Sequence, residues 1–204
     1  MLAVARENLR PTEVPITEAE PEAGPQPRAR SYRRLIRDVA ETAIVILTIY
    51  TLVNLTTARY EVQGDSMEPN FHDGQRIIVS RIAYMLGEPE RGDVIVFHYP
   101  RDPDRDFIKR VIGVPGDRVE IEGGQVSVNG QRLEEPYIQG PSRYAGAWAL
   151  GPDEFFVLGD NRNNSNDSHD FGPIGRSYIV GRAWLIYWPP DGLGVVAHYD
   201  YAGD

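Results

Sequence analysis

The stretch DFIKRVIGVPGD, residues 106–117, decides the fold, because an apolar run there ends in a sharp turn. In an extended chain, successive side chains point to opposite faces, so Phe107 and Lys109 would share one face and Arg110 would point to the other. The run stops at Pro115-Gly116-Asp117, a combination that favours a turn. This pattern predicts a β-strand with Lys109 among apolar neighbours.

Lys109 is the one lysine in a sequence that carries twenty arginines. Arginine stays protonated in proteins, whereas a lysine removed from water can lose its proton near neutral pH. Lowering its pKa from ~10.4 to ~8 costs about 3 kcal/mol, which burial can impose. Coding bias explains the many arginines but not the position of the exception. Lys109 is therefore a candidate for a functional, uncharged amine.

From Tyr60 onward the sequence consists of short β-prone runs separated by turn residues. Asn129-Gly130, between QVSV and QRL, is typical of a type I′ hairpin. We therefore expect a mainly β fold, an antiparallel β-sheet or barrel-like catalytic domain. The predicted strands are Arg59–Val62, Arg76–Ser80, Asp93–Tyr99, Phe107–Gly113, Arg118–Glu122, Gln125–Val128, Gln131–Leu133, Glu154–Leu158 and Val180–Trp188.

Before this region, the stretch Val39–Ala58 is largely apolar and follows a cluster of arginines over residues 28–37. Twenty helical residues span ~30 Å, about the thickness of a bilayer core. A cleavable signal peptide and a buried helix of a soluble protein are the alternatives to a retained transmembrane helix, which we favour. The positive charge ahead of the span predicts a cytoplasmic N-terminus and an extracytoplasmic remainder.

The sequence thus predicts three parts. Residues 1–30, rich in Pro, Glu and Ala, are expected to be a disordered cytoplasmic tail. Residues 31–58 would be the basic segment plus the transmembrane helix, and residues 59–204 an extracytoplasmic β-rich domain. Together they describe a single-pass protein of the cell membrane, in contact with membrane lipid.

Composition excludes several function classes. The absence of cysteine rules out disulfides, thiolate catalysis and cysteine-based zinc sites. The four histidines lack metal-ligand spacing, so neither a metal nor another cofactor is expected. A net charge of −9 argues against nucleic acid as a partner.

Two further segments carry residues suited to chemistry. Gly64–Pro69 (GDSMEP) follows a short strand and would present Ser66 on a turn. Gly159–Gly172 is dense in short polar side chains, which favour a loop bonded to itself. A serine in such a turn is usually only a turn residue, and such a loop is usually plain surface.

Four motifs in this order resemble those of type I signal peptidases: GDSMEP, RGDVIVF (Arg91–Phe97), FIKRVIGVPGD (Phe107–Asp117) and GDNRNNSNDSH (Gly159–His169). The resemblance covers roughly residues 35–190. It implies a membrane-bound serine endopeptidase that removes signal peptides from exported preproteins with a serine–lysine dyad through an acyl-enzyme.

By motif position, Ser66 would be the nucleophile and Lys109 the general base. Four residues would support them: Ser165 by hydrogen-bonding the lysine, Asp167 by organising the loop, and Asp160 and Arg110 by shaping the surroundings. Met67, by its motif position, and Ile77 are the candidates for substrate contacts.

The sequence departs from the family's pattern at two informative positions. Gly64 stands where some members carry a serine that assists the oxyanion. His169 replaces a common arginine, so its ion pair with Asp167 would depend on pH. Two other interpretations remain, a self-cleaving serine–lysine protease of related fold and a catalytically inactive membrane-anchored β domain.

Overall fold

The computed structural model describes residues 29–199 and 201. Residues 1–28, 200 and 202–204 lie outside the described part, and with them nearly all of the expected tail over residues 1–30. The chain divides into two compact units, residues 1–46 and 47–204.

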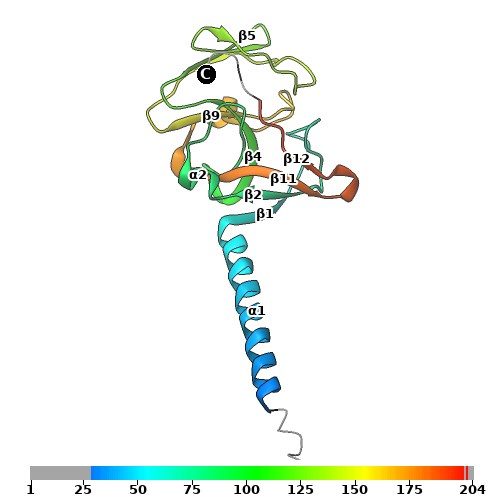
Figure 1. The fold of residues 1–204 in the computed structure, drawn as a ribbon. Coiled ribbons are helices and arrows are strands. Elements are labelled where there is room, and N and C mark those ends of the chain that lie inside the picture. The colour runs from blue at the N-terminus through cyan, green and yellow to red at the C-terminus, as the bar shows by residue number, and fades with distance from the viewer. Residues whose placement is uncertain (1–28, 200, 202–204) are drawn as a thin grey trace, which may run out of the picture. The chain divides into compact units, whose positions relative to one another are not determined.

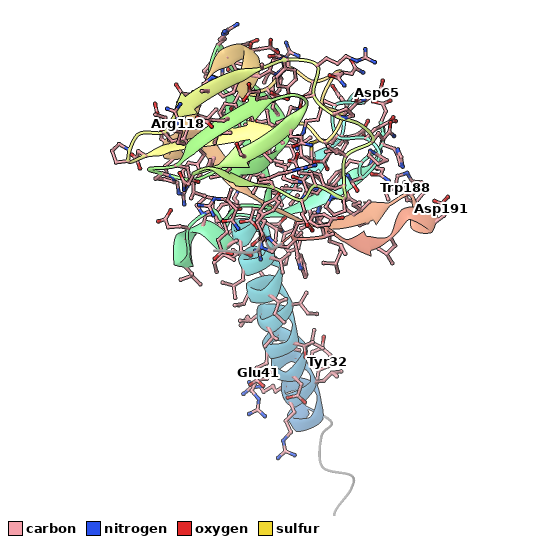
Figure 2. The ribbon with its side chains drawn as sticks, turned by 90° about the horizontal axis from the view of Figure 1, so that it is seen from above. Tyr32, Glu41, Asp65, Arg118, Trp188 and Asp191 are labelled. Carbon is pink, nitrogen blue, oxygen red and sulfur yellow. The ribbon has the colours of Figure 1, made fainter. Side chains whose placement is uncertain are left out.

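Helix α1 (Ala29–Thr56) contains the predicted apolar span. Its stretch Tyr32–Thr56 is long and apolar enough to cross a membrane, and its side chains stand exposed around the helix (Figure 2). The hydroxyl groups of Thr42, in the middle of the helix, and of Thr56, its last residue, donate to carbonyl oxygens one turn earlier at 2.8 Å, which satisfies them inside an apolar helix.

The larger sheet is antiparallel throughout and strongly curved (Figure 1). Its strands run in the order β1-β2-β11-β3-β4-β9-β10, with β12 paired to β11. Among the described strands, β1 and β10 at the two ends have one neighbour each, so the barrel that the sequence allowed does not close. The bounds are β1 (Thr57–Glu61), β2 (Arg76–Ser80), β3 (Val94–Tyr99), β4 (Asp102–Gly113), β9 (Glu154–Leu158), β10 (Ile174–Gly175), β11 (Ile179–Trp188) and β12 (Gly194–Val195).

A second antiparallel sheet has the order β7-β6-β5-β8 and lies at the end of the β unit away from β2 (Figure 1). It comprises β5 (Arg118–Glu122), β6 (Gln125–Val128), β7 (Gln131–Arg132) and β8 (Gly146–Ala149). The β6–β7 turn has positive φ at Asn129 (52°) and Gly130 (81°). Positive φ at both central residues is the type I′ geometry, so the hairpin prediction is confirmed.

Strand β4 is central to the packing because it contributes to all three hydrophobic cores. Ile112 packs in the core of the smaller sheet, Ile108 in the core beside β1 and β2, and Val111 in the core between β3 and β9. The remaining elements are short: α2 (Ala83–Leu86), α3 (Ser168–Phe171) and the 3₁₀ turns Arg176–Tyr178 and Pro190–Gly192. The prediction of a mainly antiparallel β fold with one apolar N-terminal helix is confirmed.

Candidate active site

Ser66 lies on a tight turn between β1 and β2. Gly64 enters the turn with φ 79°, a conformation that favours glycine, and its amide donates to Asp73 Oδ1 at 2.7 Å. Within the turn, the amide of Glu68 donates to the carbonyl of Asp65 at 3.1 Å. The backbone thus fixes the turn and leaves the Ser66 hydroxyl available.

The Lys109 amine lies beside that hydroxyl. From β4, Nζ reaches 2.8 Å from Ser66 Oγ and donates to the carbonyl of Ile108 at 2.7 Å. The residue is only 3% exposed. Burial lowers the pKa of Lys109 to about 8, although the carboxylates of Asp167 and Asp160 act in the opposite direction. An amine with this pKa is partly neutral near pH 8 and can accept a proton.

The two groups open onto a cleft of about 480 Å³. One wall comes from residues 60–63 of β1 and its continuation, and the other from residues 104–109 of β4, while Ile77, Val96 and Asn166 complete the lining around Ser66. Burial and the carboxylate of Asp106 on β4 raise the pKa of Tyr60 on β1, so the two walls lie close to each other.

Both walls present strand edges without a strand partner on the cleft side. Within the described residues, strand β1 pairs only with β2, and β9 pairs with β4 only from Arg110 onward. An extended peptide can bind such edges through main-chain hydrogen bonds.

A buried ion pair anchors the loop that follows β9. Arg110 and Asp160 form two hydrogen bonds, of 2.9 and 2.7 Å, with both residues 1% exposed. Burial alone would lower the pKa of Arg110, but the hydrogen bonds and charge of Asp160 raise it. Asn70, from which the sequence suggested nothing, donates to Asp160 Oδ2 and to the carbonyl of Tyr137, both at 2.8 Å.

Gly159 lets this loop approach the Ser66 turn. A Cβ at Gly159 would lie 2.4 Å from the carbonyl oxygen of Ser66 and 2.2 Å from Ser165 Oγ. The amide of Asn161 donates to the same Ser66 oxygen at 3.1 Å. Only glycine fits here without displacing its neighbours.

Asp167 lies at the start of α3, where its Oδ1 accepts from the amide of His169 at 3.2 Å. Its other oxygen accepts from the amide of Gly159 at 2.9 Å, and its side chain is fully buried. This pairing connects α3 to the glycine beside Ser66. These two hydrogen bonds hold both ends of the loop between Gly159 and His169 to one carboxylate.

Two other predicted side chains lie differently from expectation. Ser165 Oγ is buried with no hydrogen-bond partner in the described part, and the lysine amine bonds the carbonyl of its own neighbour instead. Met67 is fully buried in the core with Phe71 and Val79, so it does not line the cleft. Ile77, in contrast, does line it.

The arrangement brings a hydroxyl and a neutralisable amine together on the floor of a cleft with open strand edges. A hydroxyl becomes an effective nucleophile when a neighbouring base accepts its proton. Such a site suits acyl transfer. No group of three or more His, Asp or Glu side chains able to hold a metal ion occurs within the described residues.

Comparisons with known proteins agree on one family. The sequence profile described as "Signal peptidase, peptidase S26" matches residues 35–188. A signal peptidase I of Leptolyngbya laminosa is 43% identical over 189 residues, covering 88% of this chain and 92% of the relative. A signal peptidase IB of Staphylococcus aureus is 33% identical over 176 residues, covering 77% and 91%. A solved signal peptidase I from Enterococcus faecalis aligns at 29% identity with a TM-score of 0.44, covering 47% of this chain and 97% of that one.

Proposed function

The chain belongs to the signal peptidase family, peptidase S26, and we propose that it removes N-terminal signal peptides from exported preproteins with Ser66 as nucleophile and Lys109 as general base. The observation that carries this proposal is the 2.8 Å separation of Ser66 Oγ from the buried Lys109 amine.

Catalysis begins when the neutral Lys109 amine accepts the Ser66 proton as Oγ attacks the scissile carbonyl carbon. The carbonyl oxygen becomes an oxyanion, which the backbone amide of Ser66 would stabilise; one such donor contributes roughly 3 kcal/mol. Gly64 has no side chain to add a second donor. The protonated amine then donates its proton to the leaving amino group as the peptide bond breaks.

A water molecule completes the cycle. Lys109, neutral again, takes a proton from this water as its oxygen attacks the acyl-enzyme carbonyl. The ester bond to Ser66 Oγ breaks, and the lysine returns the proton to that oxygen. The cycle regenerates both Ser66 and Lys109, and its net reaction consumes only the substrate and one water molecule.

The cleft supports recognition of an extended peptide. The free edges of β1 and β4 would pair with its main chain, and Ile77, which lines the cleft together with Ser66, would contact substrate side chains near the cut. Small residues, such as alanine, one and three positions before the cut are the preference that membership of the family implies for these substrates.

The apolar stretch of α1 supports placement in a membrane. We infer a cytoplasmic tail over residues 1–30, a membrane anchor within 31–58 and an extracytoplasmic peptidase domain over 59–204. The arginines that precede the span favour this orientation. Cleavage would then take place where translocated chains emerge from the membrane.

A preprotein with an Ala-x-Ala site tests the function. The full-length protein in detergent micelles should cleave it, and the new N-terminus found by sequencing should follow the second alanine. The Ser66→Ala variant should be inactive. Incubation without substrate distinguishes a self-cleaving protease, which would fragment by itself. An inactive wild type would overturn the proposal.

A further inference from the structure

The His169 imidazole is held on three sides. Nδ1 lies 2.7 Å from Asp167 Oδ1, Nε2 lies 3.3 Å from Asp170 Oδ1, and the ring stacks on Tyr144 with centroids 3.8 Å apart. A carboxylate only accepts hydrogen bonds, so Nδ1 carries a proton in either charge state of the ring. The second carboxylate favours a proton on Nε2 as well.

The neighbouring groups favour the charged imidazolium. The hydrogen bond from His169 to Asp167 raises the pKa of the imidazole above 6.5, and burial opposes this increase only in part. Burial and the charge of Asp167 raise the pKa of Tyr144, which therefore stays neutral. Arg101 donates to the backbone carbonyl of Asp170, not to its carboxylate. The buried pair Arg162–Glu135 near Tyr144 balances its own charge.

The cluster connects to the proposed dyad through Asp167. This carboxylate accepts from the Gly159 amide, and its negative charge is the larger of the two that favour the protonated form of Lys109. A positive charge on His169 cancels much of that influence. When His169 loses its charge, the full influence of Asp167 on Lys109 returns.

We propose that His169 is a positioning residue whose charge, held against Asp167 between two carboxylates, sets the pH at which Lys109 becomes a neutral amine. This inference rests on the proposed function of Lys109. With a cation at position 169, Lys109 loses its proton at a lower pH. With a neutral residue there, Lys109 loses its proton at a higher pH. His169 itself changes from a cation to a neutral imidazole as the pH rises through its own raised pKa.

Three substitutions separate charge from geometry. His169→Arg supplies a permanent cation, His169→Asn keeps a donor in place of Nδ1 without the charge, and His169→Leu removes both. His72, whose imidazole is exposed and 3.6 Å from Glu68, provides the matched control His72→Asn.

The single lysine allows a direct readout. Full-length protein in detergent micelles, labelled with carbon-13 at lysine Cε, gives one NMR signal whose pH titration reports Lys109 without assignment. The midpoint should be lowest in His169→Arg and highest in His169→Asn, on the order of half a pH unit apart, about threefold in neutral fraction below the midpoint. Wild type should lie between them and His72→Asn should match it.

The acid limb of the kcat profile for preprotein cleavage should follow the same order. Equal midpoints in His169→Arg and His169→Asn, or the reverse order, would overturn the inference. His169→Leu serves as the structural reference. If His169 had only a structural role, this variant would be less stable, but the midpoints of the Lys109 titration would not follow the charge at position 169. If the NMR midpoints shift as expected while cleavage does not follow them, the role of His169 stands and the general-base role of Lys109 fails.

Discussion

At the scale of single residues, the amine of Lys109 is the group on which the proposed chemistry depends. Replacement by arginine keeps a cation but removes an available base, so Lys109→Arg should lose about 10²–10⁴-fold in kcat/KM, as Lys109→Met should. Cleavage of a preprotein at pH 8 measures this. Substantial turnover by Lys109→Arg would exclude the dyad.

The same burial makes Lys109 a source of instability. Its pKa of about 8 in the folded protein lies below the ordinary 10.5, so the unfolded chain binds the proton more tightly. Stability should therefore rise with pH between about 8 and about 10.5, and the penalty should be complete below that window. The difference corresponds to roughly 3 kcal/mol.

Lys109→Met removes this penalty. We expect the inactive variant to be more stable than wild type at pH 7, by up to roughly 3 kcal/mol, with the gain shrinking as the pH approaches 10. Unfolding in detergent micelles at both pH values measures the gain. A gain that does not change with pH would contradict the titration argument.

Gly159 is a second position where a single added atom, a Cβ, should change the activity. In Gly159→Ala, the new Cβ would meet Ser66 O at 2.4 Å, so the turn that carries the proposed nucleophile must shift. We expect kcat to fall by about 10²-fold, because small displacements of reacting groups reduce rates by that order. Gly140→Ala, with open space around its Cβ, is the control and should keep full activity. Similar kcat values for both variants would refute the close approach.

At the scale of elements, the local sequence pattern predicted those strands that are β-prone runs bounded by turn residues. The predicted bounds of β2, β5, β6 and β9 agree with the structure, because β-prone runs there end at turn residues. Strands β8, β10 and β12 were missed, since pairing with distant partners rather than local composition makes them extended. Strand β4 begins five residues before the expected Phe107, in a charged stretch where the pairing with β3 shifts register between His98 and Tyr99.

For the site, the motif resemblance predicted that Ser66 and Lys109 form a pair, and strand alternation predicted that Lys109 lies among apolar neighbours. Neither could place Asn70 on Asp160, because that contact joins segments ninety positions apart and depends on how the loops pack. Met67 was misplaced for a related reason. Its position beside the nucleophile does not reveal that the turn directs its side chain into the core.

The pair Arg110–Asp160 ties β4 to the loop after β9, and it can be tested against an exposed pair. Asp160→Asn leaves the guanidinium buried without its counter-charge and should lower the free energy of unfolding by roughly 3–5 kcal/mol. Glu120→Gln, which removes the exposed partner of Arg118, should change it by less than about 1 kcal/mol. Equal effects in thermal unfolding would show that the buried pair is not structural.

At the scale of the whole molecule, the predicted orientation in the membrane is open to direct test. Because the chain has no cysteine, single cysteines can be introduced without background labelling. In intact cells, a membrane-impermeant maleimide should label Asp191→Cys, at the exposed turn marked in Figure 2, but not Ala23→Cys. Permeabilised cells should show both labelled. The reverse pattern would invert the topology.

The unclosed sheet has a consequence for the protein's own solubility. Unpaired strand edges recruit any extended chain, including another copy of the same protein, and this is a common start of aggregation. Here the rim of the open edge carries the exposed charges of Asp104, Arg105 and Asp106. Such charges repel a second sheet approaching edge to edge, while a lone flexible strand can slip between them. The charges beside the proposed peptide-binding cleft would thus also protect the protein against self-association.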